Sequence, residues 1–237
     1  MWRMFFKIFC LSFIFPLLIK GQKNPVRYQF SKPPVDSSTT ELKKPYAENT
    51  FMYMQEAAFA YYPELKTVDI RFKEKKLKTT MAARPSLFSV FRMKKNRVYY
   101  IFINNDKKNP NSILLKELPA NAQVGVIGHE YAHILDYQSK NIFQLIGYGF
   151  KYVVSKKFKK KLENNIDKIT ISRGLGWQVY NFSSYVFNDS SVTSEYKAYK
   201  KKFYFTPPEI LKQMVENSEV YQNLAFFLQN SHYISGF

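Results

Sequence analysis

Residues 129–133 read His-Glu-Tyr-Ala-His, and the apolar side chains on both sides of this run predict that it lies on an α-helix. Residues four apart on a helix lie about 40° apart around the axis and about 6 Å apart along it. His129 and His133 can therefore present ring nitrogens to one tetrahedral Zn²⁺ ion. Glu130 projects from the flank of that face, where its carboxylate can take a proton from a metal-bound water. The chain has three histidines, and two of them belong to this run.

The residues around the motif define the predicted helix and its packing. Apolar side chains lie beside or opposite the metal-facing side at Val124, Ile127, Ile134 and Leu135. Pro119 or Asn121 can start the helix, because both residue types are favoured in or just before a first turn. Gly125 and Gly128 each cost about 1 kcal/mol relative to alanine. One hypothesis is that they let a strand or the substrate approach the metal closely, and the alternative is a helix packed tightly on a sheet.

Two histidines leave a catalytic zinc site incomplete, because such a site has three protein ligands and an open position for water. The chain's single cysteine lies in the apolar N-terminal segment, so a carboxylate is the expected third ligand. Apolar spacing at 158–169 predicts a second helix, which Gly174 and Gly176 end. Glu163 and Asp167 then share one face of that helix. We expect Glu163 to bind zinc and Asp167 to accept the second ring N–H of a ligand histidine.

Other arrangements of these residues are open. Asp136 follows the second histidine by three residues, so it can be a ligand, an acceptor for a ligand, or a local ion-pair partner. Glu163 can instead pair with Lys159 or Lys160 on a solvated basic helix. His232 lies near the C-terminus, where it is either a tail residue or a hydrogen-bond donor folded back over the site.

A helix with HEYAH followed by a helix with E-x-x-x-D resembles the gluzincin clan of zinc metallopeptidases, which includes thermolysin-like enzymes and the smaller minigluzincins. The resemblance covers about residues 45–180. It implies that Glu163 is the third zinc ligand and that Asp167 supports the site from behind the ligands. The run at 167–178 is also similar to uncharacterised secreted metallopeptidase-like proteins of bacteria. The metzincin pattern is absent, because no x-x-G-x-x-H continuation follows His133.

Upstream of the motif, the sequence predicts one helix and a small sheet. Residues 48–62 have apolar side chains at helical spacing and precede Pro63. Alternation, or β-branched and aromatic content, predicts strands at 67–72, 79–84 and 97–104. With the resemblance, this implies an α+β, zincin-like fold in which a small, mainly antiparallel sheet packs on the N-terminal helix and the HExxH helix. A mostly helical C-terminal part completes the expected fold.

The strand predicted at 97–104 has a further expected role. An edge strand beside the zinc helix can pair with an extended peptide through main-chain hydrogen bonds. The resemblance suggests 97–104 for this position. An internal place in the sheet is the alternative.

Two neighbouring segments between the motif and Glu163 differ in character. Residues 142–150 are apolar and residues 156–161 are strongly basic. A basic amphipathic segment beside exposed aromatic side chains can lie on an anionic membrane surface. The alternative is a helix that packs on the zinc helix and ends in a solvated lysine run. Farther on, helices are expected at about 177–185 and 207–217.

The N-terminus predicts export. Basic residues precede an apolar run at 8–19, which is typical of a secretory signal and short of the roughly 20 residues that a membrane span needs. We expect a signal peptide or uncleaved anchor at 1–21, an extended linker at 22–45, and a single metallopeptidase-like domain at 46–237. The mature chain would contain no cysteine, which suits a bacterial protein that is periplasmic, envelope-associated or secreted.

Net charge indicates the class of partner. The formal charge is +18, and loss of Arg3, Lys7 and Lys20 with the signal segment leaves +15. A positive surface favours lipid head groups, envelope polysaccharide or acidic peptides. Predicted export and the lack of a nucleic-acid motif argue against nucleic acid.

Together these features predict a zinc-dependent metallopeptidase that cleaves peptide bonds with a zinc-activated water and Glu130 as general base. The alternative is an exported, basic, envelope-associated binding protein whose zinc site is structural or catalytically idle. A zinc hydrolase of non-peptide bonds is a third interpretation.

Overall fold

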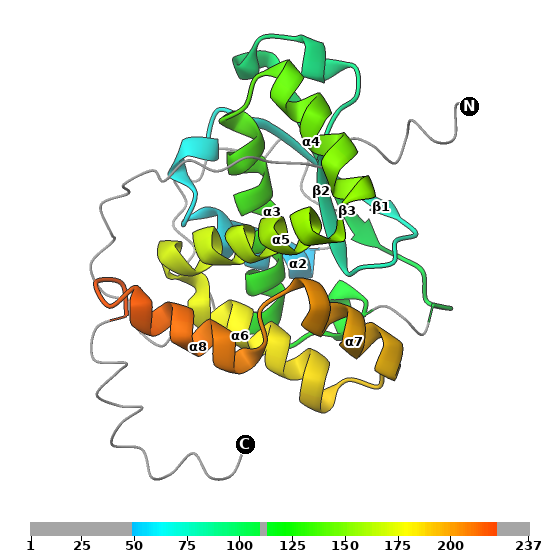
Figure 1. The fold of residues 1–237 in the computed structure, drawn as a ribbon, viewed down its shortest axis with the longest axis vertical. Coiled ribbons are helices and arrows are strands. Elements are labelled where there is room, and N and C mark those ends of the chain that lie inside the picture. The colour runs from blue at the N-terminus through cyan, green and yellow to red at the C-terminus, as the bar shows by residue number, and fades with distance from the viewer. Residues whose placement is uncertain (1–48, 110–112, 222–237) are drawn as a thin grey trace.

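The computed structural model describes residues 49–109 and 113–221, which form a three-stranded sheet and seven α-helices (Figure 1). The α+β class expected from the sequence is confirmed. Segments 1–21 and 22–45 and His232 lie outside the described residues. None of the described helices has the length and hydropathy that crossing a membrane requires. In chain order the elements are α2 (Asn49–Phe59), β1 (Asp69–Lys75), β2 (Met81–Pro85), β3 (Val98–Asn104), α3 (Ala120–Gln138), α4 (Ile142–Val154), α5 (Lys156–Thr170), α6 (Gly176–Ser184), α7 (Ser194–Phe203) and α8 (Pro207–Glu216).

β3 is the central strand of the sheet, in the order β1-β3-β2. It is parallel to β1, where Asp69 faces Val98, and antiparallel to β2, where Met81 faces Ile103. The sheet is therefore mixed rather than mainly antiparallel, and the expectation that 97–104 is an edge strand is wrong. The sequence of β3 explains its place, because the nearly continuous apolar run Val-Tyr-Tyr-Ile-Phe-Ile is typical of an internal strand.

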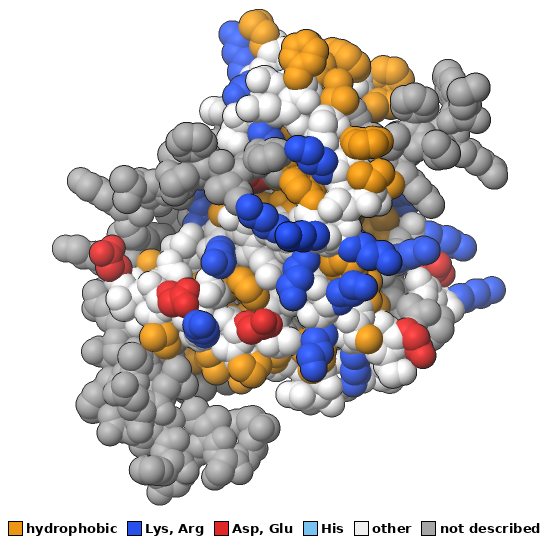
Figure 2. All heavy atoms as spheres, viewed as in Figure 1, with side chains coloured by type: hydrophobic (Ala, Val, Ile, Leu, Met, Phe, Trp, Pro, Cys, Tyr) orange, Lys and Arg blue, Asp and Glu red, His pale blue; other side chains and the backbone are white. Residues whose placement is uncertain are grey.

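Two consecutive helices, α4 and α5, connect the motif helix to Glu163. The Asn141 side chain caps α4 by accepting a hydrogen bond from a backbone N–H three residues on, at 2.9 Å. The Ser155 hydroxyl caps α5 in the same way, at 3.1 Å. α4 buries Leu145 and Tyr148 but leaves many apolar side chains exposed at the upper end of the molecule (Figure 2).

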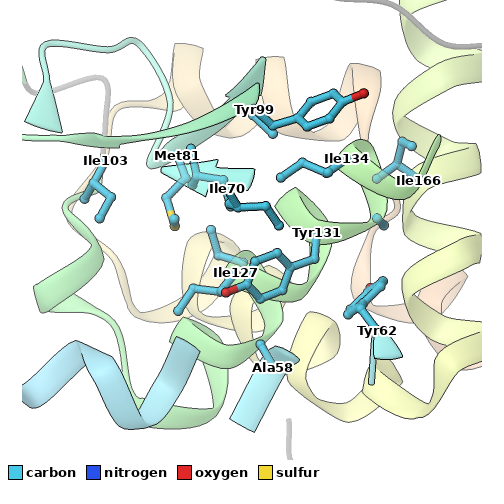
Figure 3. Packing of buried hydrophobic residues seen from close by; sticks show 14 of the residues in the cluster. Ala58, Tyr62, Ile70, Met81, Tyr99, Ile103, Ile127, Tyr131, Ile134 and Ile166 are labelled. Carbon is cyan, nitrogen blue, oxygen red and sulfur yellow. The ribbon is translucent and has the colours of Figure 1, made fainter. Parts of the chain in front are cut away.

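α3 runs through the centre of the core and is covered by α2, α5, α6 and β2 (Figure 3). This helix is buried on nearly all sides, and its buried polar side chains belong mainly to the HEYAH motif and its flanks. Tyr131, within the HEYAH motif, is fully buried. Its ring centroid lies 5.4 Å from that of Phe59 in α2 and 6.4 Å from that of Phe72 in β1. The motif is thus held rigidly by the helix and the sheet that precede it.

The two glycines of α3 make room for α6. A Cβ at Gly125 would lie 2.4 Å from the backbone oxygen of Gln178, and a Cβ at Gly128 would lie 2.4 Å from Leu175 Cδ1. A larger residue at Gly125 would force α3 and α6 apart, whereas at Gly128 it would meet the end of the Leu175 side chain just before α6. The close neighbour is therefore a helix, rather than the strand, substrate or sheet that the sequence suggested.

Gly174 ends the straight part of α5 in a wide π-helical turn at Ile171–Leu175. Its φ of 100° lies in the region that favours glycine, whereas Gly176 has a helical φ of −59° and begins α6. The predicted C-cap role therefore belongs to Gly174. Farther on, α6 and α8 match the helices expected near 177–185 and 207–217, while α7 is an additional helix.

Candidate metal centre

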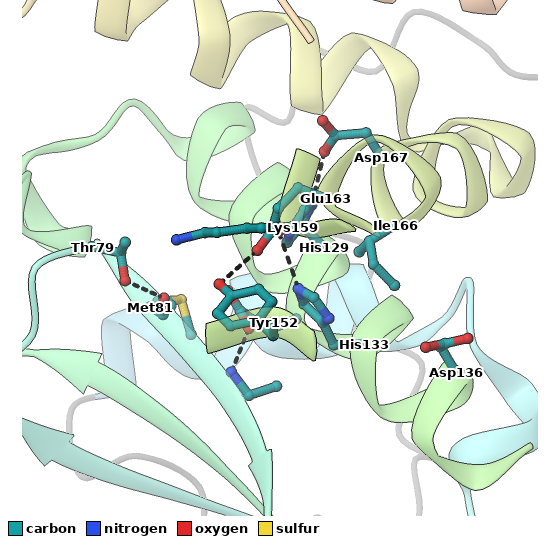
Figure 4. Close-up of polar contacts among 12 residues, drawn as sticks. Thr79, Met81, His129, His133, Asp136, Tyr152, Lys159, Glu163, Ile166 and Asp167 are labelled. Carbon is teal, nitrogen blue, oxygen red and sulfur yellow. Dashed lines mark hydrogen bonds and ion pairs between the residues drawn. The ribbon is translucent and has the colours of Figure 1, made fainter. Parts of the chain in front are cut away.

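α3 presents the two motif histidines on one face, as their four-residue spacing predicts. The ring centroids of His129 and His133 are 4.9 Å apart, and the side chains are 12% and 10% exposed. Both Nε2 atoms lie close to the carboxylate of Glu163, which α5 supplies (Figure 4). Three side chains from two helices therefore converge on one point.

The spacing of these three groups suits a metal ion. Glu163 Oε2 lies 3.4 Å from His129 Nε2 and 3.5 Å from His133 Nε2. Zinc ligands lie about 2.0–2.2 Å from the ion, so two of them at a tetrahedral angle are roughly 3.3–3.6 Å apart. This Oε2 is buried and accepts no hydrogen bond from the described residues, although such an atom normally has a partner. The three residues could therefore hold a metal ion.

Neighbouring groups fix the orientation of the ligand side chains. His129 Nδ1 lies 2.8 Å from Asp167 Oδ1, and donation by Nδ1–H leaves the Nε2 lone pair of a neutral ring facing Glu163. The other Asp167 oxygen accepts a hydrogen bond from the Phe205 N–H at 3.2 Å. The Tyr152 hydroxyl donates to Glu163 Oε1 at 2.8 Å. Each carboxylate thus turns one oxygen towards the histidines and uses the other to anchor itself.

Glu130 lies beside this group without joining it. Its Oε2 accepts a hydrogen bond from the backbone N–H of Ala83 in β2 at 2.5 Å, and the residue is buried. The Tyr137 hydroxyl donates to the Ala83 carbonyl at 3.3 Å. These two contacts hold β2 against the motif helix.

The metal-free site attracts positive charge. Burial opposes the protonation of His129, but its hydrogen bond with Asp167, its contact with the Glu163 carboxylate and the charge of Glu130 raise its pKa to about 10. Burial likewise opposes the ionisation of Glu163, yet its contacts with the two imidazoles hold the pKa of this carboxyl well below its usual value. The field that favours an imidazolium here also favours a divalent cation.

Two alternative roles for acidic residues are wrong, namely Asp136 as a zinc ligand and Glu163 as a solvated partner of the nearby lysines. Asp136 accepts hydrogen bonds from Lys140 Nζ at 2.7 Å and from the Tyr148 hydroxyl at 3.0 Å, apart from the ligand cluster (Figure 4). Burial raises the pKa of Asp136 to about 6, and the nearby ammonium limits this rise. Glu163 is 2% exposed and faces the histidines, so it is not a solvated partner of the lysine run before it.

Two tyrosines at the site were not identified from the sequence, Tyr152 on α4 and Tyr204 just after α7. The ring centroid of Tyr204 lies 5.9 Å from that of His129. Burial and the charge of Glu163 raise the pKa of the Tyr204 phenol well above 10, so the phenol stays protonated. Both residues lie far from the motif in sequence, and the chain has 18 tyrosines, so no local pattern marks them.

The ligand group lines a cleft of about 1090 Å³. β2 contributes Met81–Pro85 to its lining, and α5 and α7 contribute side chains such as Leu162 and Tyr199. Glu130 and both motif histidines also line it. The candidate centre is therefore accessible to a ligand much larger than water.

No protein-family model, curated protein or solved structure matches this chain. The resemblance to gluzincins therefore rests on the HEYAH motif with Glu163 and Asp167.

Proposed function

We propose that the protein is a zinc-dependent metallopeptidase of the gluzincin type. The observation that carries this proposal is the convergence of two histidine nitrogens on one carboxylate oxygen, at 3.4 and 3.5 Å, with all three ligand atoms within 4.8 Å of one another. Zinc suits these donors, because histidine nitrogens and one carboxylate, with a further position open, form a known type of catalytic zinc site. The adjoining cleft supports a catalytic rather than a closed structural site.

The chain's own groups have distinct roles in peptide hydrolysis. A zinc ion held by the three ligands would supply a Lewis acid and a water of lowered pKa. Glu130 would act as the general base towards the attacking water and would pass the proton to the leaving amine. The Ala83 N–H holds one oxygen of Glu130 and so orients the carboxylate. Tyr204, which stays protonated, donates a hydrogen bond to the oxyanion that forms at the scissile carbonyl.

The substrate backbone would lie along β2 rather than along 97–104. Among the described strands β2 pairs with β3 alone, and its residues Met81–Pro85 line the cleft beside Glu130. An extended peptide added to this edge would have to displace the contacts of Ala83 with Glu130 and Tyr137 to gain main-chain hydrogen bonds there.

One observation favours a different function. The Glu130 carboxylate already accepts the short hydrogen bond from Ala83, so one of its two oxygens is engaged with β2 rather than free to contact a water. A basic, envelope-associated binding protein with an idle zinc site would retain the same ligands.

The deciding experiment compares the purified protein with its Glu130→Gln variant. We expect both to bind one equivalent of zinc by elemental analysis, and only the unmodified protein to cleave members of a peptide library. Addition of a chelator should abolish the cleavage. Stoichiometric zinc with no cleavage beyond that of the variant would establish the idle site instead.

A further inference from the structure

A small pocket adjoins the metal centre and contains one buried cation. The pocket has a volume of about 50 Å³ and is bordered by His129, Glu130 and Tyr204. A second carboxylate, that of Asp167, also borders it, and its other walls are mainly apolar and include Val179 of α6. A single lysine, Lys200 of α7, also lines it.

Lys200 makes no direct ion pair with a described residue, although Glu130 and Asp167 border the same pocket. The residue is 7% exposed, and its Nζ lies over three aromatic rings, 4.0 Å from the Tyr204 centroid, 4.9 Å from the Phe182 centroid and 5.8 Å from the Tyr196 centroid. No ion pair or hydrogen bond of Lys200 to a described side chain is present. Lysine is seldom buried without an anionic partner, and aromatic faces replace only part of the lost hydration.

We propose that Lys200 binds a carboxylate of the substrate in this pocket, so that the enzyme selects peptides with an acidic residue beside the scissile bond. The inference rests on the proposed function, because the pocket adjoins Glu130 and the zinc ligands. Its size agrees with this occupant. One water needs about 10–15 Å³, so the pocket accepts roughly three to five atoms, the size of an acidic side chain.

The apolar walls strengthen the selection. A carboxylate that enters replaces its hydration with a charge-assisted hydrogen bond from an ammonium already partly desolvated. A neutral side chain of the same shape would leave that ammonium unpaired, and a cationic one would be repelled. The carboxylate can come from an acidic side chain or from a peptide C-terminus.

The test uses binding, so that it does not depend on turnover. Fluorescent peptides bind to the zinc-loaded Glu130→Gln protein in an anisotropy titration. At each position of the peptide in turn, four versions carry Glu, Gln, Leu or Lys. Each version is made with a free and with an amidated C-terminus. We expect the Glu peptide to bind about tenfold or more tighter than the Gln peptide at one position. Preference for a free C-terminus alone would assign the α-carboxylate as the source.

Variants of Lys200 identify the group responsible. Lys200→Met should remove the preference for a carboxylate, and Lys200→Arg should keep most of it. Lys201→Met is the matched control, because Lys201 is the next residue of α7 and is exposed. Equal binding of Glu, Gln and amidated peptides, or no binding of any, overturns the inference even without the variants. If the unmodified protein cleaves peptides without preferring acidic residues, the role proposed for Lys200 is wrong while the proposed peptidase function still holds.

A second and independent observation is an exposed apolar surface at the upper end of the molecule. It combines α4 with the segment at 88–93, and both reach the surface there (Figures 1 and 2). Phe88 is 84% exposed and Phe143 is 81% exposed, and Phe91, Met93, Phe150 and Val154 are exposed as well. Large contiguous apolar surfaces are rare on proteins that meet only water.

Exposed lysines surround this apolar surface, among them Lys94, Lys95, Lys151, Lys156 and Lys157. We also infer that the surface docks on an anionic lipid bilayer. Aromatic side chains would enter the region between head groups and acyl chains, and the ammonium groups would meet lipid phosphates. The combination of apolar centre and cationic rim argues for this partner, because a second copy of the same surface would bring like charges together.

Vesicle sedimentation tests this surface. We expect binding to phosphatidylglycerol vesicles and weak binding to neutral phosphatidylcholine vesicles. The double variant Phe143→Ser, Phe150→Ser should reduce the binding at least about tenfold. Tyr53→Ser, at a partly exposed aromatic residue of α2, is the control and should bind normally. Unchanged binding of the double variant, or a concentration-dependent dimer that this variant abolishes, would overturn the inference.

Discussion

Asp167 would influence a bound metal ion without contacting it. Its carboxylate holds the His129 ring through Nδ1, so its removal should loosen one ligand while leaving all three in place. We expect Asp167→Asn to lower zinc affinity about 10–100-fold in a competition titration with a chromophoric chelator. Glu163→Ala should lower the zinc affinity further, and Asp136→Ala should leave the zinc affinity unchanged. Loss of zinc in the Asp136 variant would reassign the third ligand.

His129 sets the response of the metal-free protein to pH. Its folded pKa of about 10 lies above the ordinary value of 6.5, so its protonation contributes stability that is complete below pH 6.5. This contribution is lost as the pH rises through about 10. In urea titrations with a chelator present, we therefore expect the free energy of unfolding to fall across this range. His129→Gln should lack this part of the decline, and an unchanged decline in that variant would contradict the assignment.

Local spacing allowed some of these residues to be predicted. His129 with His133, and Glu163 with Asp167, are pairs four residues apart on single helices, so the sequence already places each pair on one face. Tyr152, Tyr204 and Lys200 reach the site through the packing of α4 and α7 on α5. No spacing rule within one helix encodes such contacts, and these residues could not be found.

Helix packing makes Gly125 a sensitive position in α3. An added methyl group would meet the backbone of α6, which cannot move as a side-chain end can, so we expect Gly125→Ala to cost about 1–3 kcal/mol of unfolding free energy. The control is Gly147→Ala on α4, where a Cβ meets nothing within 4 Å. That change should stabilise the protein by up to about 1 kcal/mol. Equal effects in chemical denaturation would refute the close packing of α3 and α6.

The sequence predicted the positions of the elements with strong local patterns, but not which elements lie next to one another in the fold. The helix predicted at 48–62 ends at Phe59, and the strand predicted at 67–72 lies at Asp69–Lys75. Strand order depends on contacts between distant segments, so the central position of β3 could not be derived from local alternation. α7 was missed because its sequence, Ser-Glu-Tyr-Lys-Ala-Tyr-Lys-Lys-Lys-Phe, has few aliphatic residues to mark a buried face.

For the molecule as a whole, zinc should act as a crosslink between α3 and α5. At a free zinc concentration 1,000-fold above its Kd, binding stabilises the folded state by about 4 kcal/mol. This corresponds to a rise in Tm of roughly 8–16 °C for a chain of this size. Calorimetry with zinc and with a chelator measures the difference. Glu163→Ala should show little of it, and an equal rise in that variant would place the zinc elsewhere.

α4 connects the candidate metal centre with the exposed apolar surface. Its Tyr152 hydroxyl holds the carboxylate of Glu163, while Phe143 and Phe150 of the same helix face outwards. Because a helix moves as a rigid body, a force that tilts the outer side of α4 would also move the Tyr152 phenol, which donates a hydrogen bond to Glu163. Binding of the outer face of α4 to a bilayer would in this way also act on Tyr152, and through it on the proposed zinc ligand Glu163.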